Sequence, residues 1–448
     1  MIPAENFLTR SLRAFPDGPA VARILSAAVN AVDPGEAVRR FVHRDGATLT
    51  VAGQAYDLSG FRRICLLGIG KASVGMSEAL AGILGGQLSE GLVVTKHVPA
   101  SPPASFRVVP GGHPIPDENS LEAGEKTREL LSGLGPQDLL VCLISGGGSA
   151  LVTSPVDSVS LADLQALTGL LLACGADIQE SNALRRRLDR LKGGGVVRLA
   201  NGATVVSLIL SDVIGNPLEA IASGPTAPDP TTGAVAIAIL EKYLLDQKAP
   251  ASILKNLQSL PETPKPGDPA FEKVQNVLVG SNLQAAQAAL RQAQEEGFNP
   301  YLLRTDLQGE AREAAFELAT SLRQAHRTAT PVPAPGCIVV GGETTVTLHG
   351  NGKGGRNTEL ALAAVSELAD FPGVLLATLA TDGEDGSTDA AGAVVTGESH
   401  HYAAGLGLHA GNFLARNDSY TYFAQLEDLL KPGPTGTNVN DLVFMFTF

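Results

Sequence analysis

Two hydrophobic periods alternate along the chain. Unbroken apolar runs occupy 64–69, 91–95, 138–144 and 203–210, and a glycine- or serine-rich turn follows most of them. The segments between these runs place apolar residues three or four positions apart, as the opening stretch to Arg40 does. Continuous apolar strands separated by helices predict a largely parallel α/β sheet that is covered on both faces. We therefore expect a Rossmann-like domain in the first half.

The second half repeats this alternation after a change in composition. Between 246 and 275 the chain is rich in Lys, Pro, Gln and Gly, which neither continue a helix nor supply a sheet ladder. Helical spacing returns at 282–297 and 309–325, and apolar runs return at 277–280, 337–340 and 375–380. We therefore predict an α/β fold with two domains, residues 1–245 and 276–448, joined by a linker at 246–275.

Composition and charge narrow the functional classes. A chain of 448 residues with 44% hydrophobic content can bury more than one core, and its net charge of −13 disfavours binding to nucleic acid or an anionic membrane. The four cysteines are isolated in apolar runs, which favours buried thiols over a zinc site or disulfides. The start of the chain lacks the pattern of a secretory signal, and no apolar run reaches the ~20 residues of a membrane span, so we expect a cytoplasmic protein.

Candidate chemistry in the first half lies directly after the predicted strands. The loop 145–149, Ser-Gly-Gly-Gly-Ser, can direct successive backbone N–H groups at an anion, although a tight strand-to-helix turn would use the same residues. Lys71 follows another strand and could neutralise phosphate oxygens, or it could be a solvated lysine at a helix start. Asp212 follows a third strand, where it could ligate Mg²⁺, accept a proton or cap a helix.

A charged segment offers a site for a small carboxylate. Residues 178–195 have the pattern of one helix that ends at a glycine cap, and Arg185, Asp189 and Lys192 would share one of its faces. The alternative is a solvated charged face.

Two loops in the second half combine glycines, a cation and carboxylates. They span 341–359 and 381–392 and follow the apolar runs that begin at 337 and 375. Glycine exposes backbone N–H groups, arginine matches phosphate oxygens and carboxylates suit Mg²⁺, so the loops predict a phosphorylated ligand with magnesium. No G-x-x-x-x-G-K-[ST] motif occurs, which excludes a P-loop NTPase.

The ordered motifs resemble one family along nearly the whole chain. The matching blocks lie at 68–72, 111–117, 145–150, 211–217, 222–226, 341–344, 354–359, 381–383 and 433–441. Together they are similar to the class II glycerate kinases, whose C-terminal part is the MOFRL domain. The resemblance implies phosphorylation of D-glycerate to 2-phosphoglycerate with ATP and Mg²⁺, in a cleft between a Rossmann-like domain and a MOFRL-type α/β domain.

The resemblance and the loops together assign roles to residues. The catalytic candidates are Lys71, Asp212 and Arg356. The nucleotide-binding candidates are Gly70, Ser145, Gly146, Gly147, Gly148, Ser149, Gly342, Glu343, Thr344 and Asn357. The substrate-binding candidates are Asn182, Arg185 and Lys192, and the metal candidates are Asp382 and Asp385. The expected partner is the small-molecule substrate, and a homodimer is compatible with the sequence.

Departures from the family pattern keep other functions open. Arg187, Asp189 and Gly195 stand where relatives more usually carry His, Ser and Arg, so the substrate preference could be shifted. One alternative is a nicotinamide-dependent reductase acting on hydroxypyruvate or tartronate semialdehyde. The sequence disfavours it because Gly68 and Gly70 lack the third glycine of a dinucleotide fingerprint. The other alternative is a non-catalytic sensor of a nucleotide or hydroxy acid.

Overall fold

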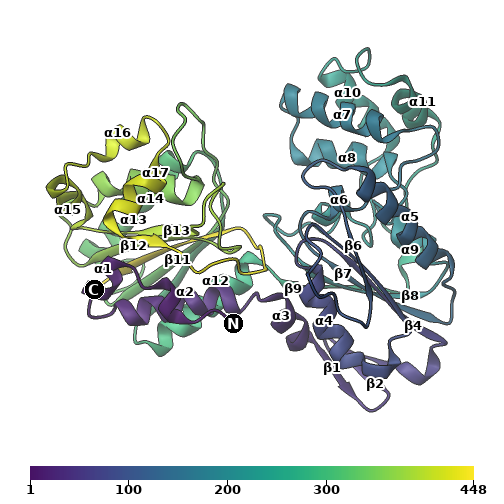
Figure 1. Ribbon diagram of the computed structural model, residues 1–448, viewed down its shortest axis with the longest axis horizontal. Coiled ribbons are helices and arrows are strands. Elements are labelled where there is room, and N and C mark those ends of the chain that lie inside the picture. Colours follow the sequence, from purple (N-terminus) through teal and green to yellow (C-terminus); the bar gives the residue numbers. More distant parts are fainter. The chain divides into compact units, whose positions relative to one another are not determined.

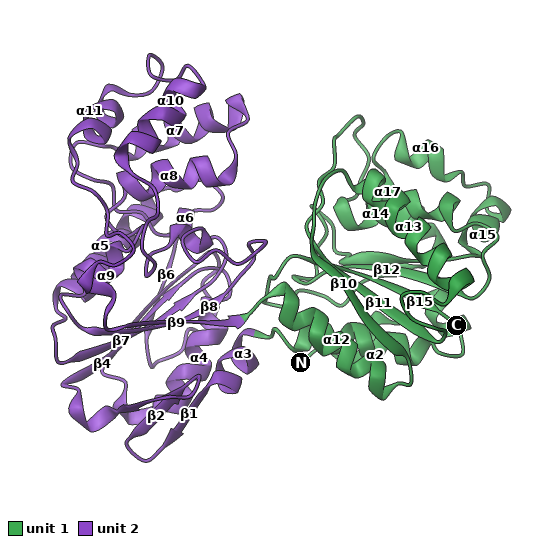
Figure 2. Ribbon diagram, turned by 180° about the vertical axis from the view of Figure 1, so that it is seen from behind, with its two compact units in different colours: residues 1–33, 280–448 green, residues 34–279 purple.

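The computed structural model describes residues 1–448, which form two compact units. Unit 1 contains residues 1–33 and 280–448, and unit 2 contains residues 34–279 (Figure 2). Each unit is built around its own six-stranded sheet. No helix is both long enough and apolar enough to cross a membrane.

The main sheet of unit 2 has the strand order of a Rossmann fold. Its strands are β4 (Arg63–Ile69), β5 (Glu90–Thr95), β6 (Arg107–Pro110), β7 (Asp138–Ile144), β8 (Thr204–Leu210) and β9 (Val274–Gly280). They lie in the order β6-β5-β4-β7-β8-β9, and the pairings from β6 through β8 are parallel. Counted along the chain this is the order 3-2-1-4-5-6, which confirms the predicted parallel sheet. The order reverses between β4 and β7, and such a switch point is where doubly wound sheets bind ligands.

Helices cover both faces of this sheet (Figure 1). On one face α5 (Glu118–Ser132) and α9 (Gly195–Leu199) pack against inward residues of β4, β7 and β8 in one buried cluster. On the other face α4 (Ser73–Leu84) buries Met76 and Leu80. Because both faces are covered, the central strands are apolar at every position rather than at alternate ones.

Two smaller substructures complete unit 2. A helical cluster contains α7 (Leu161–Cys174), α8 (Ile178–Leu188), α10 (Gly233–Lys242) and α11 (Ala251–Ser259) around a separate apolar core. An antiparallel sheet of β1 (Val42–Asp45), β2 (Thr48–Val51) and β3 (Gln54–Asp57) follows α3 (Pro34–Phe41). The short helix α6 (Gly148–Leu151) begins inside the glycine loop after β7.

The helix predicted over 178–195 is shorter in the structure. α8 ends at Leu188, and Asp189 is extended with φ −132° and ψ 133°. The backbone leaves the helix because it pairs with the segment after α6: Val156 N–H donates to the Leu188 carbonyl, and Arg190 N–H donates to the Ser154 carbonyl. Arg185, Asp189 and Lys192 therefore do not share a helix face, although all three line one pocket.

Unit 1 is a mixed sheet between helices. Its strands are β10 (Asn299–Leu307), β11 (Gly336–Gly342), β12 (Val374–Ala380), β13 (Gly392–Thr396), β14 (Leu429–Leu430) and β15 (Asp441–Thr447). The order is β10-β11-β15-β12-β13-β14, and only the β10–β11 pair is parallel. α13 (Ala311–Thr328) and α14 (Arg356–Glu367) pack on one face in a single apolar core, which confirms the predicted α/β organisation.

The opposite face is covered by α12 (Asn282–Glu295) together with α2 (Gly18–Asn30), which comes from the start of the chain (Figure 2). The remaining helices of unit 1 are α1 (Arg10–Ala14), α15 (Ser399–Gly405), α16 (Ala410–Leu414) and α17 (Ser419–Leu426). Short 3₁₀ turns occur at Ala4–Phe7, Leu58–Gly60, Gly85–Gln87, Ile221–Ser223 and Pro269–Phe271.

This division differs from the segmentation predicted at 1–245, 246–275 and 276–448. Residues 1–33 belong to unit 1, where Arg10 forms an ion pair with Asp428 at 2.8 Å. The predicted linker lies inside unit 2 and contains α11, whose Ile253 and Leu257 are buried in the helical cluster. β9 follows it as the last strand of the Rossmann sheet, so the chain passes to unit 1 only after Val279.

Candidate functional site

The loops after β4 and β7 are joined at the switch point of the Rossmann sheet. Lys71 N–H donates to the Gly146 carbonyl at 3.0 Å, and Ala72 N–H donates to Ser145 Oγ at 3.0 Å. Gly70 N–H donates to the Val94 carbonyl at 3.1 Å, which ties the same turn to β5. These contacts hold Lys71 directly beside the glycine loop that begins at Ser145.

Two glycines of this loop allow neighbouring side chains to lie against the backbone. A β-carbon at Gly146 would lie 1.9 Å from Asp212 Oδ2, so only glycine leaves room for that carboxylate. Gly147 has φ +84°, and a β-carbon there would lie 3.1 Å from His113 Cδ2 and 3.2 Å from Lys71 Cε. Lys71, His113 and Asp212 therefore lie around the short stretch of backbone at Gly146 and Gly147. The catalytic roles of Lys71 and Asp212 stay predictions.

Three ionisable side chains, Lys71, His113 and Asp212, set the electrostatics of this stretch. The Lys71 side chain is exposed and forms no ion pair. Burial, followed by the charges of Lys71 and Lys96, lowers the pKa of His113 from 6.5 to about 4, so this imidazole is neutral at pH 7. Asp212 is followed by turns rather than by a helix, which excludes the helix-capping alternative. Lys71 is thus the cation beside the glycine loop, and the carboxylate of Asp212 lies on the same stretch.

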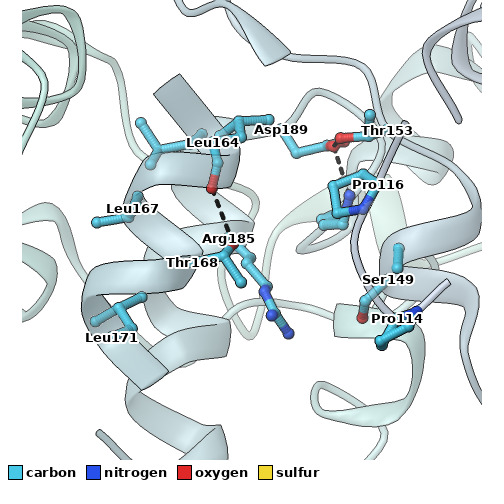
Figure 3. A pocket seen from close by; sticks show the side chains of 13 residues that line it. Pro114, Pro116, Ser149, Thr153, Leu164, Leu167, Thr168, Leu171, Arg185 and Asp189 are labelled. Atoms are coloured by element: carbon cyan, nitrogen blue, oxygen red, sulfur yellow. Dashed lines mark hydrogen bonds and ion pairs between the residues drawn. The ribbon is translucent and has the colours of Figure 1, made fainter. Parts of the chain in front are cut away.

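A pocket lies next to Ser149, where the glycine loop enters α6 (Figure 3). One wall is apolar and is formed by leucines of α7 and by Pro114 and Pro116. The guanidinium of Arg185 points into the pocket, and it forms no hydrogen bond or ion pair. Burial lowers the pKa of Arg185, which means that the charge lacks its full hydration. Such a cation favours an anionic ligand.

Lys192 lines the same pocket, but its charge is already paired. Its ammonium lies 2.5 Å from Asp189 Oδ2 and also donates to the Val152 carbonyl at 3.1 Å, with both side chains buried. Asp189 accepts further hydrogen bonds from Thr153 Oγ1 at 2.6 Å and from Ser154 N–H at 3.0 Å. Burial lowers the pKa of Lys192, and the charge of Asp189 opposes that shift. Arg185 is therefore the cation that this pocket offers to a ligand.

In unit 1, Arg356 begins α14 and is held by carboxylates. Its guanidinium contacts Asp441 in two hydrogen bonds, of 2.5 and 3.0 Å, and lies 3.3 Å from Glu343 Oε1. Asn440 donates to Glu343 Oε2 at 2.6 Å. Burial raises the pKa of Asp441 to about 7, although the hydrogen bond and charge of Arg356 lower it. Burial lowers the pKa of Arg356, but the hydrogen bond to Asp441 and the nearby carboxylates raise it overall. The hydrogen-bond geometry is that of an ion pair.

The predicted nucleotide-binding residues of unit 1 also meet. Gly342 ends β11, and Glu343 N–H donates to the Leu307 carbonyl at 2.8 Å. A small pocket beside them is lined by Gly342, Thr344, Asn357 and Asp441 together with apolar residues of the sheet and of α14. The order of motifs along the sequence therefore corresponds to neighbours in space within this unit.

The two aspartates predicted as metal ligands have different surroundings. Asp385 is buried, and its oxygens accept hydrogen bonds from Asn357 N–H at 3.0 Å, Thr358 N–H at 2.8 Å and Thr358 Oγ1 at 2.8 Å. This is the pattern of a residue that caps the start of α14. Asp382 is half-buried and accepts from Glu384 N–H at 3.1 Å. The metal role of both residues stays a prediction.

Several residues of these sites received no role from the sequence. His113 lies in the block 111–117, but nothing in that block indicates that it faces Lys71. Asp441 closes the block 433–441, and its partner Arg356 is 85 positions away. Ser223 bonds Ser149 across 74 positions. The sequence does show polar residues at the ends of strands and beside glycines. This pattern marks candidate site residues, but it does not show which of them contact one another.

The geometry of unit 2 defines a doubly wound α/β domain of the class that binds nucleotides or other phosphorylated ligands at its switch point. Comparison with known proteins identifies the family. Residues 20–258 match a domain described as "Domain of unknown function (DUF4147)", and residues 336–441 match the MOFRL family. The chain is 38% identical to the glycerate 2-kinase of Pyrococcus horikoshii over 94% of this chain and 95% of that protein.

A solved structure and a second relative extend this comparison. The crystal structure of glycerate kinase from Thermotoga maritima matches with a TM-score of 0.86 and 36% identity, covering 96% of this chain and 99% of that chain. A protein of Agrobacterium vitis named "Putative hydroxypyruvate reductase" is 42% identical over 85% of this chain and 86% of its own length. The chain belongs to the glycerate kinase family with a MOFRL domain, and the enzyme class predicted from its motifs, a kinase, is confirmed.

Proposed function

We propose that the protein transfers the γ-phosphoryl group of ATP to the C2 hydroxyl of D-glycerate, with Mg²⁺. The observation that carries this proposal is the meeting of Lys71, Asp212 and the backbone of Gly146 and Gly147 at the switch point. A cation, a carboxylate and backbone N–H groups suit phosphoryl transfer, because it depends on positioning and on charge stabilisation.

Each group has a role in a balanced transfer. The Arg185 guanidinium binds the substrate carboxylate, supported by the wall that Lys192 and Asp189 form. Asp212 accepts the proton of the C2 hydroxyl, whose oxygen forms a bond to the γ-phosphorus. The bond from that phosphorus to the bridging oxygen breaks, and ADP leaves with the electron pair. Lys71 and Arg356 stabilise the charge on the transferred group.

The residues present suit magnesium in the way that ATP-dependent enzymes use it. Mg²⁺ usually binds one or two carboxylates, phosphate oxygens and several waters rather than an all-protein cage. The structure contains no group of three or more His, Cys, Asp or Glu side chains that could hold a metal ion. Asp382 would contribute a carboxylate to the ion, which neutralises phosphate charge when bound. We leave Asp385 out of this shell because its oxygens already accept three hydrogen bonds.

A phosphorus NMR time course with ATP, Mg²⁺ and D-glycerate tests the proposal directly. Formation of 2-phosphoglycerate is the expected result. The 3-isomer would keep the kinase but overturn the choice of hydroxyl, and the absence of any phosphorylated product would refute the reaction.

The second candidate activity is that of a hydroxypyruvate reductase, the name that one relative carries. It is tested separately by giving the protein hydroxypyruvate together with NADH or NADPH. The structure gives no support to nicotinamide binding. Ser73 occupies the third glycine position, and its hydroxyl donates to the Gly70 carbonyl at 2.7 Å inside the turn. β5 ends at Thr95 and is followed by Lys96, where a dinucleotide site would place a ribose-binding acid. A non-catalytic sensor would bind ATP or glycerate without turnover.

A further inference from the structure

Three polar side chains form a hydrogen-bonded row that leads from the interior of unit 2 to the Arg185 pocket. Ser223 is fully buried, and its hydroxyl donates to Asn182 Oδ1 at 3.0 Å. Ser149, which lines the pocket, lies 2.7 Å from Ser223 Oγ. The oxygen of the Asn182 amide faces Ser223, and Asn182 Nδ2 lies on the other side, 3.5 Å from the Ala220 carbonyl.

The direction of each bond in this row follows from the number of protons. A serine hydroxyl has one proton and two lone pairs. Ser223 gives its proton to Asn182, so it can only accept in its bond with Ser149. Ser149 must therefore donate its own proton to Ser223, which leaves Ser149 Oγ with acceptor capacity only on the side of the pocket. A phosphate group, which needs donors, gains nothing from such an oxygen.

The backbone that carries Ser223 is held in an uncommon conformation. Ala222 and Ser223 have φ of 50° and 59°, in the left-handed region that non-glycine residues seldom adopt. Such strain persists where surrounding contacts impose it, often beside functional sites. Here Gly193 N–H donates to the Ser223 carbonyl at 3.0 Å, and Ser223 N–H donates to the Ala220 carbonyl at 3.1 Å. These contacts place the Ser223 hydroxyl under Ser149.

We infer that Ser149 determines specificity by accepting a hydrogen bond from the substrate hydroxyl that is not phosphorylated, while Arg185 binds the carboxylate. Asn182 and Ser223 are positioning residues that act through Ser149. The ligand class is thus a short carboxylic acid with a second hydroxyl group. This inference rests on the proposed function, and it moves Ser149 from the nucleotide site predicted from the sequence to the substrate site. Figure 3 shows Ser149 and the Arg185 guanidinium facing the same space.

D-lactate provides the test, because it keeps the carboxylate and the C2 hydroxyl of D-glycerate but lacks the C3 hydroxyl. We expect the wild-type protein to prefer D-glycerate in kcat/KM by about tenfold or more, the range of one hydrogen bond to a buried acceptor. Ser149→Ala should lower kcat/KM for D-glycerate by about tenfold and leave that for D-lactate nearly unchanged. Ser149→Cys keeps the side-chain shape with a poor acceptor and should behave in the same way.

Ser223→Ala should also lower the preference, and by less, because Ser149 can then turn its proton into the pocket. Ser132→Ala, at an exposed serine on α5, is the matched control and should change neither rate. A wild-type protein without preference overturns the inference. Ser149 variants that lose both activities equally would also overturn it. A Ser149→Ala variant that changes only the KM for ATP would do the same, because it would show that Ser149 binds the nucleotide. If the wild-type protein turns over neither acid, the proposed reaction fails, and the ratio of the two equilibrium binding constants decides this inference instead.

Discussion

Lys71 gives the most direct test of the proposed chemistry at the level of one residue. Its side chain is exposed and unpaired, so its removal should cost little folding stability. We expect Lys71→Ala to lower kcat by about a hundredfold or more and to leave the thermal midpoint nearly unchanged, because a charge used mainly in the transition state acts on kcat. Lys126→Ala, at a lysine paired with Glu122 on the surface of α5, is the control. Wild-type turnover in Lys71→Ala would remove Lys71 from the mechanism.

Arg356 carries the same proposed role but cannot be tested in the same way. The sequence predicts that Arg356→Ala leaves the fold intact, whereas the structure places Arg356 in two hydrogen bonds with a buried carboxylate, Asp441. Removal of the arginine leaves that buried group without its ion-pair partner, which lowers folding stability. A loss of activity in this variant would therefore mix catalysis with stability.

His113 should make the stability of the protein depend on pH. Burial and the nearby lysines lower its pKa to about 4 in the folded protein, against 6.5 in the unfolded chain. Between these values the unfolded chain binds more protons, so stability falls as the pH falls from 6.5 to 4, and His113 has no effect above that window. In His113→Gln, the free energy of unfolding should therefore fall by about 1–2 kcal/mol less at low pH than in the wild type. This value allows for the partial exposure of His113.

Urea unfolding at pH 7, 6 and 5 measures this effect. The wild-type protein should lose more stability than His113→Gln between pH 7 and 5, whereas His43→Gln, at an exposed histidine of the same unit, should follow the wild type. Equal pH slopes in all three proteins would mean that His113 titrates normally and does not lie against Lys71.

At the scale of elements, the start of α14 contributes both to folding stability and to the candidate site in unit 1. Asp385 caps the helix whose first residue is Arg356, so its loss should loosen both. We expect Asp385→Ala to lower the free energy of unfolding by about 1–3 kcal/mol, because a cap is lost and buried N–H groups lose their acceptor. Chemical denaturation without Mg²⁺ measures this change, with Glu384→Ala as the exposed neighbouring control. Unchanged stability combined with a weaker response to Mg²⁺ would restore the metal role of Asp385.

The elements also mark the limit of what the sequence predicts. The strands 64–69 and 138–144 could be predicted because a sheet covered on both faces requires unbroken apolar runs. The end of α8 could not, because the helical pattern continues past Leu188 while Asp189 is held by Thr153 and Ser154, over 30 positions away. Likewise, the candidates Arg356 and Asp385 were visible, but their partners Asp441 and Thr358 lie 85 and 27 positions away. Local periodicity predicts which face is buried and carries no information on which distant group it meets.

At the scale of the whole molecule, the same limit applies to the division into units. The helical pattern near the N-terminus predicted α2, with Val21, Leu25 and Val29 on its buried face. That pattern did not reveal that the face packs against α12, more than 250 positions along the chain. The proline-rich stretch before β9 suggested a boundary, yet it folds back into unit 2, so composition alone placed the boundary too early.

The discontinuity of unit 1 leads to a prediction about fragments. Residues 34–279 contain a complete sheet, its covering helices and its own cores, so this fragment should fold cooperatively alone. Residues 280–448 lack α1 and α2, so the part of α12 that packs against α2 in the whole chain is left open to water. We expect this second fragment to show no cooperative thermal transition by circular dichroism until residues 1–33 are supplied as a peptide or joined by permutation. A fragment 280–448 that melts at the same temperature with and without residues 1–33 would show that the N-terminal helices are an accessory to unit 1 rather than part of its core.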